Sequence, residues 1–205
     1  MATTPEVLTS MKQRRGVSYP VLVPNVRGLE NLLQIHGSSP GPIVDEIAIF
    51  TAASDSFNKA NTNKTIQESL FELEKVVALA REKGLRVRGY VSTVITCPFE
   101  GTIQPRKVHD VSSALFNMGC YEVSLGDTVG TGTEKTVKAL MEEAVRGLPM
   151  DKIAVSCSFN GENSKPIDWL VSRFMYVFCV ACIVASVLKQ GSRITIHLAW
   201  QLPMS

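Results

Sequence analysis

The sequence predicts an α/β fold in which parallel strands alternate with helices, as in a (β/α) barrel. Apolar runs of strand length recur at intervals of roughly 30–40 residues, the size of one strand–helix unit, and stripes of helical period lie between them. Neither a GxGxxG nor a Walker motif follows any of these strands. Because doubly wound nucleotide-binding sheets depend on such motifs, a barrel with its site at the carboxyl ends of the strands is favoured.

Five strands and four helices account for the first three quarters of the chain. Each expected strand is an apolar run bounded by turn residues, and the five lie at residues 19–24, 46–50, 86–92, 120–125 and 153–155. Each expected helix carries one apolar stripe, and the four lie at residues 26–34, 66–83, 106–118 and 134–146. The stretches 54–65 and 95–105 are expected to be loops.

The character of the sequence changes at residue 156. We therefore divide the chain into a partial barrel, residues 1–155, and a divergent tail, residues 156–205, in which residues 174–188 form an uncharged apolar run. Spanning a bilayer takes about 20 apolar residues, and shorter runs more often form buried helices. A membrane anchor is therefore not expected, although the length of this run falls between the two classes. The last residues show no usable periodicity.

Composition excludes several classes of protein. Hydrophobic residues make up 45% and charged residues 20%, as in soluble globular proteins. The net charge is only +2, and the sequence shows no cluster of basic residues of the kind that nucleic-acid binding requires. The five cysteines are odd in number and form no CxxC pair in the first 178 residues, so a disulfide framework is not expected and a reducing compartment is favoured.

Asp127 is the first candidate for chemistry, because the turn Gly126-Asp127-Thr128 directly follows an expected strand. A carboxylate there can accept a hydrogen bond from a substrate hydroxyl or act as a base. The alternative is that Asp127 caps the following turn of chain. Gly126, Gly130 and Gly132 resemble a phosphate cradle only loosely and favour tight turning instead.

Cys97 is a candidate nucleophile, since it lies in the loop after a strand. No histidine stands at a comparable strand end in residues 1–155 to lower its pKa, so a bystander thiol is favoured. No HxH, HxxxH or carboxylate–histidine spacing predicts a metal site.

Arg88 and Glu122 are candidates for the barrel interior. In each of their strands the polar residues alternate with apolar ones, so both side chains can lie on the face opposite the helices and meet on neighbouring strands. The alternative places them at a helix-facing or exposed edge position.

Several motifs resemble hydroxymethylglutaryl-CoA lyase from about residue 4 to residue 155. They are YPVLVPN (19–25), FTAASDSFNKANTNKTIQES (50–69), RGYVS (88–92), CPFEG (97–101) and MGCYEVSLGDTVGTGT (118–133). The resemblance implies a TIM barrel of which this chain holds about strands three to seven. It further implies cleavage of 3-hydroxy-3-methylglutaryl-CoA to acetyl-CoA and acetoacetate, with an acyl-CoA substrate, a divalent metal (Mg²⁺ or Mn²⁺), and roles in leucine catabolism and ketone body formation.

By the same resemblance, Asp127 matches an active-site aspartate, Arg88 supports the barrel interior, and Cys97 has no assigned role. The sequence also departs from the family. The Arg-Asp-Gly motif of the family's first strand and the glutamate of its second have no counterpart, and Ser156 and Ser158 stand where the family has two metal-binding histidines. Two neutral hydroxyls do not replace two imidazoles at a divalent metal, so no cofactor is predicted for this chain.

Two functions therefore compete. One is the carbon–carbon lyase itself, with its site restored from elsewhere, for instance by a partner chain. The other, which we favour, is a catalytically inactive form that acts only in binding an acyl-CoA ligand or another subunit. A homo-oligomer remains open. The family implies a mitochondrial location for many members, and the absence of an N-terminal targeting pattern here favours the cytosol.

Overall fold

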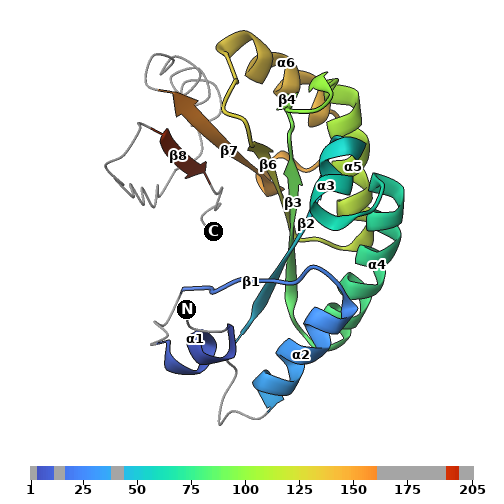
Figure 1. The fold of residues 1–205 in the computed structure, drawn as a ribbon, viewed down its shortest axis with the longest axis vertical. Helices are drawn as coiled ribbons and strands as arrows, with labels where there is room; N and C mark the ends of the chain where they lie inside the picture. The colour runs from blue at the N-terminus through green and yellow to red at the C-terminus, as the bar shows by residue number, and fades with distance from the viewer. Residues whose placement is uncertain (1–3, 12–16, 38–43, 161–192, 199–205) are drawn as a thin grey trace.

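The computed structural model describes residues 4–11, 17–37, 44–160 and 193–198, the stretches 157–160 and 193–198 by their backbone (Figure 1). Its main feature is a six-stranded sheet in the order β1-β2-β3-β6-β7-β8. The strands are β1 (Val21–Leu22), β2 (Glu46–Ala52), β3 (Arg86–Ser92), β6 (Glu122–Asp127), β7 (Ile153–Asn160) and β8 (Arg193–Leu198). The first five are parallel, and among the described residues the sheet does not close on itself. The predicted α/β class and open parallel sheet are therefore confirmed.

The strand β8 was not predicted. It pairs antiparallel with β7, with Val155 opposite Leu198 and Asn160 opposite Arg193. The sequence there alternates Ile194, Ile196 and Leu198 with polar residues, a strand pattern too short to stand out in a tail of otherwise mixed composition. The apolar run 174–188 lies outside the described residues.

The helices lie on one face of the sheet, apart from α1 (Figure 1). They are α1 (Thr4–Ser10), α2 (Val26–Gly37), α3 (Asp55–Thr62), α4 (Ile66–Glu82), α5 (Pro105–Met118) and α6 (Glu134–Ala144). Four of them, α2, α4, α5 and α6, correspond to predicted helices. In the part of the chain that the structure describes, no helix is both long and apolar enough to cross a bilayer.

The helix α3 corrects the expectation of a polar loop at 54–65. The Ser54 side chain accepts a hydrogen bond from the Phe57 N–H at its start, and Asn63 ends it in the left-handed conformation with φ 57°. The buried Asn58 side chain then donates to the carbonyls of Lys64 and Thr65. These polar side chains satisfy the backbone of a short helix that has little apolar periodicity.

The stretch 95–105 is also more ordered than a loop. Thr96–Cys97 (β4) and Gly101–Thr102 (β5) form a small antiparallel hairpin above the end of β3, and Gly101 takes a positive φ of 73° in its turn. Val94, Ile95 and Ile103 beside it are buried, so the hairpin is seated on the core.

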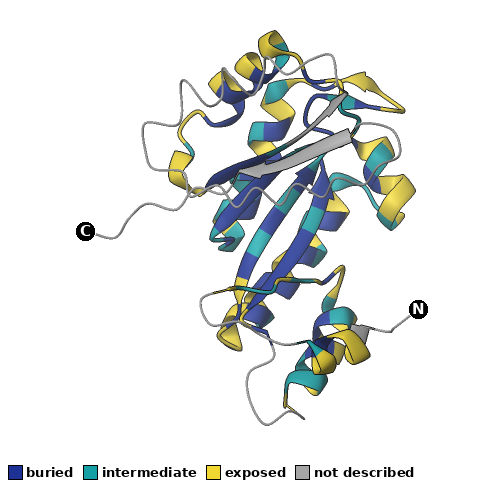
Figure 2. Cartoon of the chain, turned by 90° about the vertical axis from the view of Figure 1, so that its left-hand side faces the viewer, coloured by how far each residue is buried: buried dark blue, intermediate teal, exposed yellow. Residues whose placement is uncertain are grey.

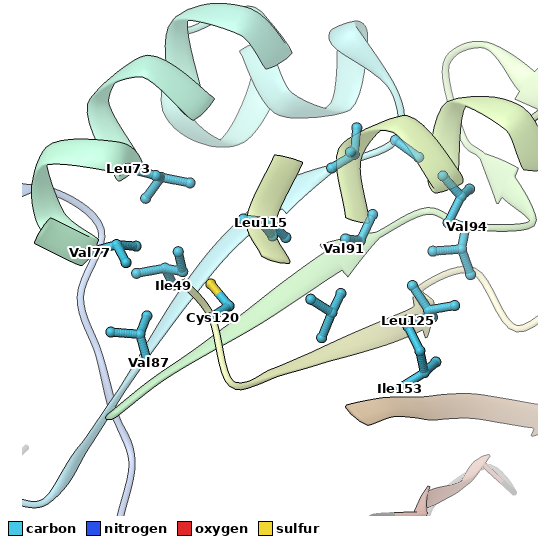
Figure 3. Packing of buried hydrophobic residues seen from close by; sticks show 14 of the residues in the cluster. Ile49, Leu73, Val77, Val87, Val91, Val94, Leu115, Cys120, Leu125 and Ile153 are labelled. Carbon is cyan, nitrogen blue, oxygen red and sulfur yellow. The ribbon is translucent and has the colours of Figure 1, made fainter. Parts of the chain in front are cut away.

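The core lies between the sheet and its helices (Figure 3). Val87 and Val91 of β3 face this layer, together with Val123 and Leu125 of β6, and each is 1% exposed or less. Gly89 lies between the two valines, where a Cβ atom would be 3.0 Å from Leu115 Cδ1 of α5. The helix α5 can therefore approach β3 closely at this point.

The other face of the sheet is concave and carries the alternate residues of each strand. Figure 2 looks onto this face, with the strands in front of the helices. Arg88, Tyr90 and Ser92 of β3 are each half-buried there, and Leu22 of β1 is 59% exposed. In a closed barrel this face would be the interior.

Candidate functional site

The carboxyl ends of β2, β3 and β6 lie side by side, as parallel pairing requires. Three connections begin there: the start of α3, the segment 93–104 with its hairpin, and the loop 128–132 before α6. Binding and catalytic groups of (β/α) barrels are drawn from such connections. This edge is the candidate site.

Asp127 ends β6, and its carboxylate is engaged by the loop that follows. Its Oδ1 accepts the Gly130 N–H at 3.1 Å and its Oδ2 accepts the Gly132 N–H at 2.8 Å. Asp127 shares the helix-facing side of the strand with Val123 and Leu125, and it is 3% exposed. The geometry is that of a carboxylate capping a turn.

The glycines of this turn let its backbone approach the Asp127 carboxylate closely. Gly130 has a φ of 75°, and a Cβ atom on Gly132 would lie only 2.8 Å from Asp127 Oδ2. Both positions therefore suit glycine for reasons internal to the loop. Gly126 lies on the concave face beside Ser156, its register partner in β7.

The concave positions near this edge carry hydroxyl groups. Ser124 is buried and lies opposite Tyr90 in the register, and Ser156 follows on β7. Ser158 lies two residues further along β7, opposite Thr195 of β8. Among the described residues, no three His, Cys, Asp or Glu side chains come together in a way that could hold a metal ion. The hydroxyls present are poor ligands for a divalent metal without carboxylate or imidazole partners, so the donor set does not fit one.

Arg88 and Glu122 meet on the concave face, near the start of β6. Arg88 Nη1 lies 2.8 Å from Glu122 Oε1, and Arg88 Nε lies 3.1 Å from Glu46 Oε1 on β2. The same guanidinium donates to the Tyr121 hydroxyl at 2.7 Å. Arg86 adds a second cation, 3.0 Å from Glu46 Oε2. We call Glu46, Arg86, Arg88, Tyr121 and Glu122 the arginine cluster.

Burial and charge act against each other in the arginine cluster. Burial alone would lower the pKa of Arg88, but Glu122, Tyr121 and Glu46 together raise it above its ordinary value. Burial raises the pKa of Tyr121 to about 12, against the opposing effect of Arg88. Burial also raises the pKa of Glu122, which Arg88 lowers and Glu46 raises further. Arg88 therefore remains a permanent cation that joins three strands.

Glu46 and Tyr121 escaped the sequence analysis. Glu46 opens an otherwise apolar run and is 1% exposed, so the signal was a carboxylate where a fully buried strand begins. Its partner Arg88 is distant in the sequence, and only the register of β2 against β3 brings the two together.

Cys97 takes part in the contacts of the hairpin. Its Sγ lies 2.9 Å from Ser54 Oγ and accepts the Phe99 N–H at 3.3 Å, and the side chain is 1% exposed. Ser54 Oγ also donates to Glu100 Oε1 at 2.8 Å. Glu100 was not singled out in the sequence, because a carboxylate in a loop is ordinarily solvated. Cys97 and Cys120 are free thiols.

Comparisons with known proteins place this geometry in a family. The HMGL-like family model matches residues 18–160. The rat cytoplasmic 3-hydroxy-3-methylglutaryl-CoA lyase is 47% identical over 157 residues, which are 77% of this chain and 44% of that protein. The bovine mitochondrial hydroxymethylglutaryl-CoA lyase is 43% identical over 77% of this chain and 46% of its own length.

A solved structure agrees. The HMG-CoA lyase from Brucella melitensis superposes with a TM-score of 0.73 at 41% identity, covering 78% of this chain and 54% of that one. The chain thus spans about half the length of the curated relatives it matches. The family fold is a TIM barrel, of which the described sheet forms an open part. On its sequence and its fold, the chain belongs to the HMG-CoA lyase family.

Proposed function

We propose that this chain binds an acyl-CoA ligand of its family at the carboxyl ends of β2, β3 and β6, and that its lyase activity is impaired. The acyl-CoA class comes from the names of its relatives, which are lyases of 3-hydroxy-3-methylglutaryl-CoA. The observation that carries the impairment is the state of Asp127, whose two carboxylate oxygens each accept a backbone N–H of the loop.

The chemistry of the family explains why this matters. Cleavage to acetyl-CoA and acetoacetate needs a base to take the proton of the tertiary hydroxyl as the carbon–carbon bond breaks, and a positive group to stabilise the charge that develops. In Asp127 both carboxylate oxygens are held by backbone N–H groups of its own loop, and the side chain lies on the helix-facing side of the strand, away from the concave face. Asp127 then acts as a positioning residue for the loop 128–132.

Arg88 does not supply the missing charge in this proposal. It pairs with the first residue of β6, whereas Asp127 is the last, which separates them by on the order of 16 Å along the strand. Its guanidinium is also committed to Glu46, Glu122 and Tyr121. We therefore assign Arg88 and Glu122 to holding the interior of the sheet.

The second candidate is the lyase activity itself, completed by residues of a partner chain. The concave face favours it, because Ala52, Ser92, Gly126 and Ser156 at the carboxyl ends of the strands all have small side chains. A partner carrying metal ligands and an arginine could then supply what these positions lack.

Acetoacetate release separates the two candidates. The full chain is incubated with 3-hydroxy-3-methylglutaryl-CoA and Mg²⁺ or Mn²⁺, beside the variant Asp127→Asn. We expect no measurable release from either protein, since losing one electrostatic donor costs about 10²–10³ in rate, and Ser156 and Ser158 stand at the two positions where the resemblance implies metal-binding histidines. Metal-dependent release that Asp127→Asn abolishes would overturn the proposed impairment. Coenzyme A titration by calorimetry tests the ligand-binding half separately.

A further inference from the structure

The hairpin β4–β5 lies between two other connections of the site edge and makes side-chain contacts with both. It follows β3 directly, with α3 beginning on one side and the loop 128–132 on the other. Its base is fixed on the core, because Val94 and Ile103 are 2% and 4% exposed. The backbone N–H of Ile103 donates to the carbonyl of Ile95 at 3.0 Å, which closes the hairpin below its turn.

Glu100, in the turn of the hairpin, makes the contact with α3. Its Oε1 accepts the Ser56 N–H at 2.7 Å and the Ser54 hydroxyl at 2.8 Å. Ser54 is the N-cap of α3, so one carboxylate oxygen satisfies two donors at the start of that helix. Phe99 of the same turn packs on Phe57 of α3, with ring centroids 6.4 Å apart.

Threonine hydroxyls make the contact with the loop 128–132. Thr131 Oγ1 donates to Thr96 Oγ1 at 2.7 Å, which joins the loop to β4. Thr128 Oγ1 accepts the Thr93 N–H at 2.9 Å, at the point where the chain leaves β3. Thr93 itself is fully buried with a φ of 57°, a conformation that is costly for a β-branched residue. Strain of this kind persists only where neighbouring contacts hold it.

We propose that the hairpin β4–β5 is a brace that couples the start of α3 to the loop 128–132, and that Glu100 is its positioning residue. Through this brace, the contact at Ser54 and Ser56 sets where Thr96 meets Thr131, and so where the Asp127 loop lies. The proposal deepens the acyl-CoA binding function and rests on it for its ligand, but the coupling itself is a property of the free protein.

Amide hydrogen exchange of the full chain tests the coupling. In Glu100→Ala we expect exchange of the Ser56 amide to rise by about tenfold or more, as for the loss of a charge-assisted hydrogen bond. We also expect the amides of Gly130 and Gly132, which donate to Asp127, to exchange several-fold faster. Glu100→Gln keeps an acceptor oxygen at the same place and should restore most of the protection at all three amides. Glu74→Ala, at an exposed position of α4, is the matched control.

Three results decide the proposal. Faster exchange at Ser56 with unchanged Gly130 and Gly132 would overturn it, because the hairpin would then be a local cap of α3. If Glu100→Gln does not restore protection, the positioning role is overturned, because the negative charge of Glu100 and not the place of its acceptor oxygen would then account for the effect. A parallel titration with coenzyme A should show weaker binding in Glu100→Ala than in Glu100→Gln. If the unmodified chain binds no coenzyme A, the proposed function fails, while the exchange result still decides the brace.

Discussion

At the scale of single residues, Arg88 is the side chain that joins neighbouring strands of the concave face. Its guanidinium contacts Glu46 on β2, Glu122 on β6 and the hydroxyl of Tyr121. Glu46 is 1% exposed, and water cannot replace its partner. Removing Arg88 would leave Glu46 with Arg86 alone and Glu122 without its ion-pair partner, and a buried charge left without its partner costs far more than the ion pair contributes.

We therefore predict that Arg88→Met destabilises the protein by about 3 kcal/mol, at the low end of the range for such buried pairs because Arg88 is partly exposed. Urea unfolding followed by circular dichroism measures the change. Arg106→Met is the control, since Arg106 is 74% exposed and pairs with an exposed Asp110. That variant should change stability by no more than about 0.5 kcal/mol. Equal effects of the two substitutions would contradict the role given to Arg88.

The raised pKa of Glu122 predicts that the stability of the folded protein depends on pH. Burial and the charge of Glu46 raise its pKa above the ordinary 4.5, although Arg88 opposes them. The folded state thus binds a proton more tightly than the unfolded state does. The contribution of this group is complete below its unfolded pKa and is lost as the pH rises through the folded pKa. In Glu122→Gln, which has no proton to lose, the unfolding free energy should fall less from mildly acid to neutral pH.

Urea unfolding across that pH interval measures how the unfolding free energy changes with pH, with Glu74→Gln as the control. Parallel slopes for the unmodified chain and Glu122→Gln would count against the raised pKa.

The alternation of polar and apolar residues predicted one contact of the concave face. It indicated that Arg88 and Glu122 could face the same side, and the structure brings them together at 2.8 Å. Asp127 was expected in the turn after this strand, but the structure makes it the last residue of β6, buried on the same side as Val123 and Leu125. The partners of Glu100 could not be predicted, because they belong to the start of α3, a helix that the sequence did not indicate.

At the scale of elements, a close approach of a helix to the sheet occurs at Gly89 of β3. A Cβ atom there would lie 3.0 Å from Leu115 Cδ1 and 3.4 Å from Cys120 Sγ. Leu115 and Cys120 are both buried, so neither can move into solvent. The packing of α5 on β3 depends on the missing side chain.

We predict that Gly89→Val destabilises the protein by about 1–3 kcal/mol through overpacking. Thermal unfolding gives the change. The double variant Gly89→Val with Leu115→Val should recover part of the loss, because the second substitution removes the atom that the introduced side chain would meet. Strictly additive losses would show that the two positions do not compete for the same space.

Elements with strong apolar periodicity were predicted well, and elements stabilised by polar contacts were not. The helix α4 has both a stripe of buried residues and a capping box between Thr65 and Glu68. The helix α3 instead depends on Ser54, Asn58 and Asn63. β8 depends on pairing with β7, a long-range contact that the short alternating pattern of β8 was not enough to predict.

At the scale of the whole molecule, the concave face is the unusual feature. Parallel sheets are ordinarily covered on both faces. Here Leu22 is 59% exposed at the edge strand β1, next to a groove of about 430 Å³ lined by α1 and residues 18–22. Apolar surface beside a strand edge with which no other described strand pairs favours association.

We therefore predict that the chain aggregates when it is expressed without a partner. Size-exclusion chromatography with light scattering measures this, and Leu22→Lys should raise the soluble fraction by placing a charge on the edge strand. Leu22→Ile, which keeps the apolar surface, is the matched control. A monodisperse monomer that melts cooperatively would contradict the prediction.

The pairing of β2 with β3 has a consequence for the order of folding. All seven residues of each strand are in register, and a single helix, α4, follows the short α3 in the connection between them. This is the longest run of paired residues in the described sheet, so this unit is suited to be the folding nucleus. Substitutions within it should then mainly slow folding, whereas substitutions where β7 meets β8 should mainly speed unfolding. An early nucleus of this kind would form before the concave face has any neighbour to cover it.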